Sequence, residues 1–431
     1  MTYEECVGFY ESRTRFGIRP GLERINALLH ALGDPHKGLK AIHVAGTNGK
    51  GTVCIFLQNI LTRAGYKTGL FISPYISDFR ERIQTDGVMI SKSDLISVTQ
   101  RVKDALESLP GDVEVTEFEA ITAAAFLYYK ESGCDIAVLE TGLGGRLDAT
   151  NVIEDPLVCV ITSVSFDHMG VLGDSLTQIA GEKCGIIKPG CKVVSSPAQF
   201  PEVIDVIKAV CREREAELCV PDEPAVVSGD IAGSVMEYRG VRFRVPFPGA
   251  HQARNAVTAI EAIRAIGKLG YPVGDEALTA GIAGAKNPAR TEIISRSPLV
   301  ILDGSHNTGS VEALRALVRE YLKDKDITAV VSMMADKQVE DCLEKILPLC
   351  GRAVCTKASN PRAEEAEGLA VVARKYCTDV AVEPDPFEAC IKGIAAAGED
   401  GVALIFGSLY FAGDVRDRLI AHFSKADRSY Y

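Results

Sequence analysis

An apolar run, a glycine-rich turn and a second apolar run follow one another near the start of the chain. LKAIHVAG (39–46) has the continuity of a buried strand, and TVCIFLQNILTRAG (52–65) places apolar residues at helical spacing. KTGLFISP (67–74) then has the length and the Gly and Pro boundaries of another buried strand. Strand, helix and strand in this order predict a βαβ unit and a parallel sheet.

The same alternation continues to about residue 270. Thr116 with Glu119 three residues later is a capping box, which opens a helix over 116–133. Apolar patterns then predict strands and helices in turn: strands at 135–142 and 156–168, a helix at 174–187, short strands within 219–247 and a helix at 249–270.

The chain is long enough for two domains. Its 431 residues exceed what one hydrophobic core usually serves. KNPART (286–291) combines Pro with polar residues and is predicted to be a hinge. Beyond it, LVILDG, ITAVVSM, RAVCTK, DVAVE and VALIFG alternate with helix-like segments. We predict an α/β fold with a domain at 1–287 and a smaller, doubly wound domain at 288–431.

Charge and hydropathy exclude some classes of protein. The formal net charge of −11 gives no broad basic surface for a nucleic acid. The N-terminal MTYEECVGFYESR lacks the layout of a signal peptide, and no apolar run approaches the roughly 18 residues that span a bilayer. We expect a cytoplasmic protein that binds neither nucleic acid nor membrane, and a monomer, since no heptad pattern suggests assembly.

The cysteines do not form a recognisable framework. There are 13, an odd number, without a C-x-x-C pair. Many lie in apolar runs, as Cys159 does, and are predicted to be small buried hydrophobic residues in a reducing compartment.

The turn AGTNGKGT (45–52) nearly matches a phosphate-binding P-loop, G-x-x-x-x-G-K-[ST], but Gly51 stands between Lys50 and Thr52. A tight structural turn would explain the glycines alone. A strand before the turn, a lysine within it and a threonine at the helix start place anion donors, a cation and a Mg²⁺ ligand together. We therefore predict a site for a nucleoside triphosphate.

Acidic and glycine-rich residues follow the strand at 135–142. Glu140 ends that strand, where a phosphate loop needs a second acidic residue for its metal. A capping acid is the alternative, although a buried carboxylate without a cation partner is costly. TGLGGRLDATN (141–151) then sets Arg146 and Asp148 beside glycines that let the backbone approach a ligand closely.

Five segments together resemble the folylpolyglutamate synthase and dihydrofolate synthase family, within the Mur ligase superfamily. They are HVAGTNGKGTV, SPYISDFRERI, LETGLGGRLDATN, SFDHMGVLG with EKCGIIKPG, and DGSHN. The extra glycine of the turn is that family's own form of the loop. The resemblance runs in order from about Gly21 to Tyr410.

The resemblance implies amide-bond synthesis. ATP would phosphorylate a carboxylate of a folate or dihydropteroate, and the amino group of L-glutamate would attack the acyl phosphate, leaving ADP and phosphate. A Mur-type ligase for another amino acid is a rival, which the lack of a sugar-nucleotide domain before the loop disfavours. A regulatory P-loop NTPase is a second rival, which would not need the second domain.

The resemblance also implies roles for the residues that match the family's motifs. Lys183 matches a carbamylated lysine that would serve the second of two Mg²⁺ ions, although from sequence alone it is an ordinary solvated helix lysine. His168 matches a metal ligand, although a lone histidine after a strand is more often structural. The phosphate loop is Gly46, Thr47, Asn48, Gly49, Lys50, Gly51 and Thr52, and the metal ligands are Thr52, Ser73, Glu140, His168 and Lys183.

Four further residues match nucleotide or catalytic positions. Asn255 matches a contact near the adenine, and Arg290 and Asp303 match ATP contacts reached from the hinge and the second domain. His306 would help bind glutamate or position the phosphoryl group. The resemblance thus implies four catalytic residues, which are Lys50, Lys183, His168 and His306. Residues on both sides of a boundary imply domain closure, which would protect the acyl phosphate from water.

The remaining matches concern the pterin substrate. Gly21 and Leu22 in GLERI, and Glu117 and Phe118 in TEFE, match segments near the pterin site, where Phe118 would stack on the ring or instead anchor its helix in the core. Arg80 and Arg82 are candidate partners for substrate carboxylates. Substrate residues are thus Gly21, Leu22, Arg80, Arg82, Glu117, Phe118, Arg146 and Asp148. Tyr75 departs from the family, which usually has His there.

Overall fold

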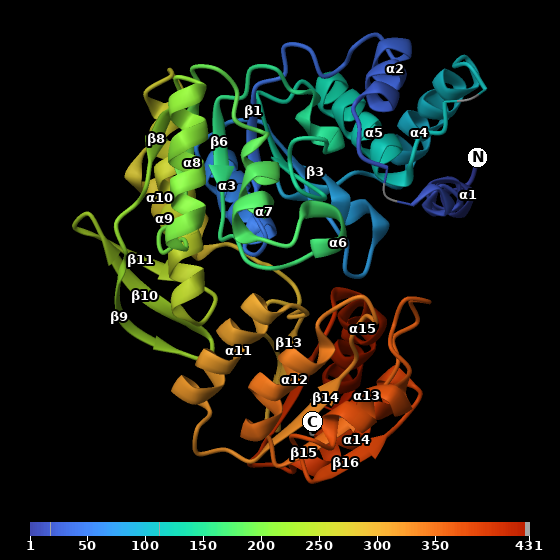
Figure 1. Cartoon of the computed structure of the whole chain (residues 1–431), viewed down its shortest axis with the longest axis vertical. Helices are drawn as coiled ribbons and strands as arrows, with labels where there is room; N and C mark the ends of the chain where they lie inside the picture. The colour runs from blue at the N-terminus through green and yellow to red at the C-terminus, as the bar shows by residue number, and fades with distance from the viewer. Residues whose placement is uncertain (18, 112, 427–431) are drawn as a thin grey trace. The chain divides into compact units, whose positions relative to one another are not determined.

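The computed structural model describes residues 1–17, 19–111 and 113–426, which form two compact units (Figure 1). The first unit contains residues 1–225, 236–245 and 252–285. The second contains residues 226–235 and 246–251 and the chain from Lys286 onward. Each unit has its own sheet and its own hydrophobic clusters.

The sheet of the first unit has eight strands in the described residues, in the order β4-β3-β2-β5-β1-β6-β7-β8. The strands from β2 to β8 in this order are parallel, and β3 and β4 extend the sheet as antiparallel strands. The bounds are β1 Ala41–Ala45, β2 Thr68–Phe71, β3 Ile83–Thr85, β4 Val88–Met89, β5 Ile136–Glu140, β6 Val158–Ile161, β7 Lys192–Ser195 and β8 Glu217–Cys219.

Helices cover the faces of this sheet, which is why β1 and β5 are buried along their whole length. Helix α3 packs against β1, β2 and β5, while α1, α2, α4 and α5 share one apolar cluster with the sheet. The bounds are α1 Tyr3–Glu11, α2 Glu23–Ala31, α3 Lys50–Arg63, α4 Lys92–Glu107, α5 Glu117–Ser132, α6 Met169–Leu172, α7 Leu176–Cys184, α8 Pro201–Glu213, α9 Ala250–Gly267 and α10 Asp275–Ala283.

Short elements complete this part of the chain. A small sheet of order β11-β10-β9 follows the main sheet in sequence, with β9 Ala225–Asp230, β10 Gly233–Tyr238 and β11 Val241–Val245. Single 3₁₀ turns stand at η1 Thr14–Phe16, η2 Phe79–Arg82 and η3 Ala149–Val152.

The sheet of the second unit has the order β12-β13-β17-β14-β15-β16 in the described residues. All pairs are parallel except β12 with β13. The strands are β12 Glu292–Arg296, β13 Leu299–Asp303, β14 Ile327–Val331, β15 Arg352–Cys355, β16 Asp379–Val382 and β17 Val402–Phe406. After β16, at the edge of the sheet, the chain returns to place β17 between β13 and β14. A change in winding direction of this kind is typical of a doubly wound sheet.

Helices lie on both faces of this second sheet. Helices α11, α12 and α13 share one apolar cluster with the strands, whereas α14 packs on β14, β15 and β17, and α15 packs on β12, β13 and β17. The bounds are α11 Thr308–Tyr321, α12 Val339–Ile346, η4 Leu347–Leu349, α13 Ala366–Ala373, α14 Pro386–Ala397 and α15 Leu409–Ala426.

The predicted fold class is confirmed, and several element boundaries need correction. The predicted strand at 156–168 ends at Ile161, because the polar residues after it turn to meet the phosphate loop. The helix predicted at 174–187 ends at Cys184, before Lys188-Pro189-Gly190. The capping box of Thr116 and Glu119 is present. No helix within the described residues is long and apolar enough to cross a membrane.

Candidate active site

Two glycines fix the course of the phosphate loop. Gly46 has φ +153° and Gly49 has φ +87°, in the region that residues with a Cβ atom avoid. A Cβ atom at Gly46 would lie 1.8 Å from Thr162 Oγ1, and one at Gly49 would lie 2.4 Å from Asn255 Oδ1. Both positions therefore require glycine, and Asn255 of α9 lies directly against the loop.

The loop is attached to the segment that follows β6. The backbone N–H groups of Thr47 and Asn48 donate to Ser163 O, and Asn48 Nδ2 donates to Ser165 Oγ at 3.1 Å. The Thr47 hydroxyl donates to Ser165 O and accepts from its backbone N–H. These contacts hold the loop open at the start of α3, where the N–H groups of the first helical turn are available to an anion.

Two lysines converge on one backbone carbonyl of the loop. Lys50 Nζ donates to Gly46 O and Thr47 O at 3.2 Å, and Lys183 Nζ donates to Gly46 O at 2.8 Å. Only 4% of Lys183 is exposed. Burial lowers the pKa of Lys183 to about 7, and the charge of Lys50 acts in the same direction. Much of Lys183 is therefore neutral near neutral pH.

The carboxylate of Glu140 faces the first turn of α3. Glu140 ends β5 and is only 5% exposed, and its Oε2 accepts from Ser73 N at 3.0 Å. A Cβ atom at Gly51 would lie 3.6 Å from the same oxygen. Ser73 therefore contacts the Glu140 carboxylate through its backbone, and Thr52 follows Gly51 in the first turn of α3.

His168 stands at the start of α6 in an unusual conformation. Its φ of +50° is left-handed, and its backbone N–H donates to Asp167 Oδ1 at 2.9 Å. The charge of Asp167 also acts on Lys183 and raises its pKa, against the effect of burial. Asp167 therefore belongs to the same electrostatic environment as the two lysines.

Asp148 holds its own turn together. Its Oδ2 accepts from Leu143 N at 2.8 Å, and its Oδ1 accepts from Thr150 N and from Thr150 Oγ1 at 2.6 Å. Burial raises the pKa of Asp148, while the bonds from Thr150 and the backbone lower it. The carboxylate predicted to meet substrate thus shapes the glycine-rich turn, and its role toward substrate stays a prediction.

His43 connects this turn to β1. Its Nε2 lies 2.7 Å from Thr150 Oγ1. Because that hydroxyl donates to Asp148, the imidazole must donate to the hydroxyl, so Nε2 carries the hydrogen. Burial lowers the pKa of His43 to about 3, which keeps the ring neutral.

Arg146 is directed toward α7. Its guanidinium donates to Glu182 Oε1 at 2.9 and 3.1 Å, and its backbone N–H donates to Glu182 O at 2.8 Å. The side chain is 57% exposed. The glycine-rich turn is therefore anchored beside Lys183, the neighbour of Glu182.

Phe118 covers the start of the same turn. A Cβ atom at Gly142 would lie 2.6 Å from Phe118 Cζ, and the ring centroids of Phe118 and Phe71 are 5.7 Å apart. The half-buried ring thus combines a core contact with a place against the turn. The two predicted roles, core anchor and ring-stacking partner, remain compatible with this position.

Arg82 and Glu117 form an ion pair at the start of α5. Arg82 Nη1 lies 3.0 Å from Glu117 Oε1, and the guanidinium lies 5.3 Å from the Tyr75 ring centroid. Arg80 pairs instead with Asp78 at 2.6 Å. Neither arginine is a solvated loop residue, because both lie in η2 and both have acidic partners.

Gly21 and Leu22 lie at the start of α2. Gly21 has φ +135°, and Leu22 is the residue before the helix and packs on the cluster that contains α5. Arg24, in the first turn of α2, pairs with Glu119 at 3.0 Å. The segments GLERI and TEFE are therefore neighbours in the fold.

In the second unit, Asp303 fixes the turn that carries Arg290. Its Oδ2 accepts from Thr291 N at 2.7 Å and from Thr291 Oγ1 at 3.0 Å, and its Oδ1 accepts from Ser305 N at 2.8 Å. Ala289 and Thr291 have φ of +54° and +50°. Arg290 thus lies between two residues of left-handed φ, and the buried Asp303 holds Thr291 in place.

His306 follows β13 at the carboxyl edge of the second sheet. Its Nδ1 lies 2.8 Å from Gly304 O and, because a carbonyl only accepts, Nδ1 donates. Its backbone N–H donates to Ser310 Oγ at 3.1 Å. The ring is oriented by its own loop before any substrate binds.

The donors near the loop fit a hard cation. Among the described residues, no group of three or more His, Cys, Asp or Glu side chains could hold a metal ion. Mg²⁺ usually takes one or two carboxylates and completes its shell with hydroxyls, waters and phosphate oxygens. Glu140 with Thr52 and Ser73 fits that pattern, and His168 and Lys183 are the further predicted ligands.

Several contributors were not predicted. Ser163, Ser165 and Asp167 hold the loop or act on its lysines, and all three lie in the polar run that follows the strand before His168. A polar run directly after a buried strand is the signal that could have identified them. His43 and Thr150 could not be identified in this way. His43 lies inside an apolar run, where it looks like a core residue, and Thr150 lies in the glycine-rich turn and not in a polar run after a strand.

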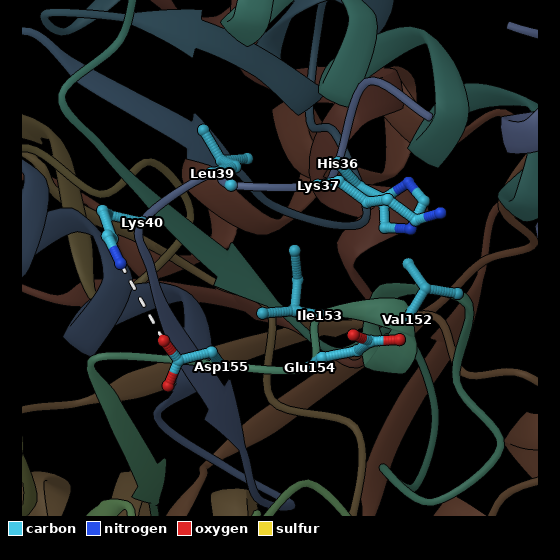
Figure 2. Close-up of a pocket in the computed structure, with 9 residues that line it drawn as sticks. His36, Lys37, Leu39, Lys40, Val152, Ile153, Glu154 and Asp155 are labelled. Atoms are coloured by element: carbon cyan, nitrogen blue, oxygen red, sulfur yellow. Dashed lines mark ion pairs between the residues drawn. The ribbon is translucent and has the colours of Figure 1, made fainter. Parts of the chain in front are cut away.

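A hollow lies at the amino end of β1, opposite the end that carries the phosphate loop. It measures about 260 Å³ and is lined by residues 36–40, just before β1, and by residues 152–155 (Figure 2). Lys40 and Asp155 form an ion pair of 3.8 Å beside it. The phosphate loop follows the carboxyl end of β1, so this hollow is separate from the predicted site.

Comparison with known proteins identifies the family. The model of the Mur ligase middle domain matches residues 44–263, and that of the Mur ligase glutamate ligase domain matches residues 289–409. A dihydrofolate synthase/folylpolyglutamate synthase of Bacillus subtilis is 36% identical over 97% of this chain and 99% of its own. A folylpolyglutamate synthase of Lacticaseibacillus casei is 33% identical over 97% and 99%.

Solved structures agree with these relatives. The Mycobacterium tuberculosis folylpolyglutamate synthase complexed with ADP superposes with a TM-score of 0.89 at 30% identity, covering 97% of this chain and 98% of that one. The Escherichia coli FolC in complex with DHPP and ADP gives 0.86 at 30% identity, covering 98% of each chain. The chain therefore belongs to the folylpolyglutamate synthase and dihydrofolate synthase family of Mur ligases.

Proposed function

We propose that the protein is an ATP-dependent ligase that adds L-glutamate to a folate, and also to dihydropteroate. The γ-phosphoryl group of ATP is transferred to the acceptor's carboxylate, and the amino group of glutamate displaces phosphate from the acyl phosphate. ADP and phosphate are released. The names of the relatives support both reactions, since several are named for dihydrofolate synthase as well as folylpolyglutamate synthase.

One observation carries the proposal: Lys50 and Lys183 meet at the carbonyl of Gly46, at the start of α3 and close to Glu140. Helix-start N–H groups and Lys50 bind the phosphates of ATP. The positive φ of Gly46 and Gly49 gives the loop the course that ends at the first turn of α3, where the phosphates would bind. Asn255, against Gly49, is proposed to meet the nucleotide beside the loop.

Glu140, Thr52 and Ser73 would hold Mg²⁺ with ATP. When bound, the ion neutralises charge on the phosphates. The hydrogen bond from Ser73 N fixes one Glu140 oxygen, so the carboxylate is oriented before the ion arrives. His168, whose backbone N–H donates to Asp167, is proposed as a further ligand.

Lys183 is proposed to carry a carbamate. The reaction adds CO₂ to a neutral amine, and the buried Nζ beside Gly46 is kept from full protonation by its surroundings. A carbamate at this position would be an anion among Lys50 and the phosphate loop, and would serve the second Mg²⁺. The resemblance of the EKCGIIKPG segment to the family is the other support.

The second unit is proposed to complete the reaction. Arg290 and Asp303 would meet ATP, and the oriented His306 would bind glutamate or position the phosphoryl group. Phe118, the Arg82–Glu117 pair and the turn around Arg146 and Asp148 would border the pterin and its carboxylate, with Gly21 and Leu22 nearby. We propose that the enzyme acts as a monomer.

The experiment supplies Mg-ATP and L-glutamate with dihydropteroate, with tetrahydrofolate or with no pterin, and follows ADP release and product mass. We expect turnover with each acceptor and a product heavier by one glutamyl unit. Turnover with tetrahydrofolate alone would restrict the enzyme to polyglutamylation. Equal ADP release without any pterin would refute the ligase and favour the regulatory NTPase.

A further inference from the structure

Two cysteines outside the proposed site lie side by side. Cys159 is in β6 and Cys191 directly precedes β7, and their Sγ atoms are 3.8 Å apart. The two strands are parallel neighbours, with Cys159 paired in register to Val193. Cys191 is two residues before Val193, so both thiols are on the same face of the sheet.

The two thiols differ in access. Cys159 is fully buried, and its Sγ donates to Ile186 O at 3.1 Å. Cys191 is 9% exposed and lies below the turn of Pro189 and Gly190, which are both exposed. A small oxidant from solvent therefore reaches Cys191 first. Cys159 is oxidised only by reaction with the oxidised Cys191.

The surroundings also favour a reactive Cys191. The neighbouring Cys159 thiol lowers the pKa of Cys191, and backbone groups and the charge of Lys188 act in the same direction. Lys188 is held next to the pair by a hydrogen bond from its Nζ to Asn151 O at 3.2 Å. A thiolate, rather than a thiol, is the nucleophile in thiol oxidation.

We propose that Cys159 and Cys191 form a modification site, in which hydrogen peroxide converts the two thiols into a reversible intramolecular disulfide. The inference does not depend on the proposed ligase function. It rests on the contact of the two sulfur atoms, their unequal access and the lysine beside them.

The reaction has two steps and needs one molecule of peroxide. The Cys191 thiolate attacks one peroxide oxygen, an S–O bond forms, and the O–O bond breaks to release hydroxide, which takes up a proton as water. The Cys159 sulfur then attacks the Cys191 sulfur, the S–S bond forms, and the S–O bond breaks to release a second water with the Cys159 proton. Two thiols are oxidised by two electrons and the peroxide is reduced.

The bond requires a local movement. A disulfide brings the sulfur atoms to about 2.05 Å, closer than they lie here. Cys191 lies at the end of a turn, so the segment 188–191 can move toward β6 more easily than a residue inside a strand. Cys159 also loses the hydrogen that it donates to Ile186, three residues after Lys183.

The test uses the full-length reduced protein. It is treated with hydrogen peroxide, quenched with an alkylating reagent, digested and analysed by mass spectrometry, with and without a thiol reductant. We expect one cross-linked peptide pair that joins Cys159 to Cys191, with the loss of two hydrogen masses, and recovery of both alkylated peptides after reduction. This measurement needs no variant.

Two variants sharpen the result. Cys211→Ser changes a third thiol of the same apolar cluster and should leave the cross-link intact. Cys159→Ser removes the resolving thiol, so Cys191 should be trapped as sulfenic acid by a dimedone reagent. The proposal is overturned if peroxide leaves Cys159 and Cys191 alkylatable, or if Cys191 is linked instead to Cys184 or Cys211.

Discussion

Lys183 Nζ donates to the backbone carbonyl of Gly46 at 2.8 Å, and Lys50 Nζ donates to the same carbonyl at 3.2 Å. Two ammonium groups at one carbonyl repel each other, and deprotonation of the buried lysine relieves the repulsion. In the proposed mechanism, this relationship would prepare Lys183 for reaction with CO₂, and Lys50 would contact the phosphates.

Removal of CO₂ should lower the activity, and bicarbonate should restore it, because a carbamate forms only from the neutral amine and is in equilibrium with CO₂. We expect a loss of about tenfold or more, equivalent to about 1.4 kcal/mol in the barrier. Turnover is measured in degassed buffer before and after addition of bicarbonate. In Lys183→Met the activity should be low and bicarbonate should not change it; equal responses in the two proteins would contradict the carbamate.

Gly49→Ala should destabilise the first unit, whereas Gly51→Ala should not. Alanine in the left-handed conformation of Gly49 costs about 1–2 kcal/mol, and its Cβ would also displace Asn255. Gly51 lies in α3, where alanine is favoured by about 0.5–1 kcal/mol and a Cβ atom makes ordinary contacts. Denaturant unfolding of both variants measures the difference. Similar losses in both would show that the loop is not held as described.

Arg82→Met should lower the free energy of unfolding by about 1–3 kcal/mol, because the partly buried Glu117 carboxylate loses its partner. The same variant should raise KM for the pterin acceptor more than KM for ATP. Arg101→Met is the matched control, since its pair with Glu131 is exposed and is worth less than about 1 kcal/mol. Equal losses of stability in the two variants would mean that the Arg82–Glu117 pair contributes no more than an exposed pair.

His43 should make the stability of the first unit fall in acid. Its pKa is about 3 in the folded protein and about 6.5 in the unfolded chain, so between these values only the unfolded state binds the proton. Stability then falls as the pH drops through this window, by up to about 1.4 kcal/mol per pH unit from this group.

His43→Gln removes this titration and keeps an amide N–H that can reach Thr150. Its unfolding free energy should therefore depend less on pH between 6.5 and 4 than that of the wild type, as measured by denaturant titrations at each pH. His43→Leu, which cannot donate to Thr150, should also raise KM for the acceptor. Parallel pH dependence in wild type and His43→Gln would mean that His43 is not buried and neutral.

Much of the fold was predictable because local patterns agree with it. The strand before Gly46, the capping box at Thr116 and the buried strand ending at Glu140 are all present where expected. The alternation of strands and helices predicted parallel sheets in both parts. Strand order was not predictable, because pairing between β1 and β5 depends on contacts far apart in sequence.

The candidate site was predictable only in part. Motifs singled out the loop, Glu140 and Lys183 as candidates, but they did not predict the contacts around these residues. The link from His43 through Thr150 to Asp148 joins three distant positions, and no local pattern indicates it. Asp148 illustrates the limit, since its motif predicted a substrate contact and its carboxylate accepts three hydrogen bonds from its own turn.

The most direct test of the central claim follows an oxygen atom. Tetrahydrofolate labelled with ¹⁸O in its free carboxylates is incubated with Mg-ATP, L-glutamate and the enzyme, and the released phosphate is analysed by mass spectrometry. If the carboxylate is phosphorylated and then attacked by glutamate, one ¹⁸O atom must appear in each phosphate. Unlabelled phosphate released together with glutamylated product would contradict the acyl-phosphate route.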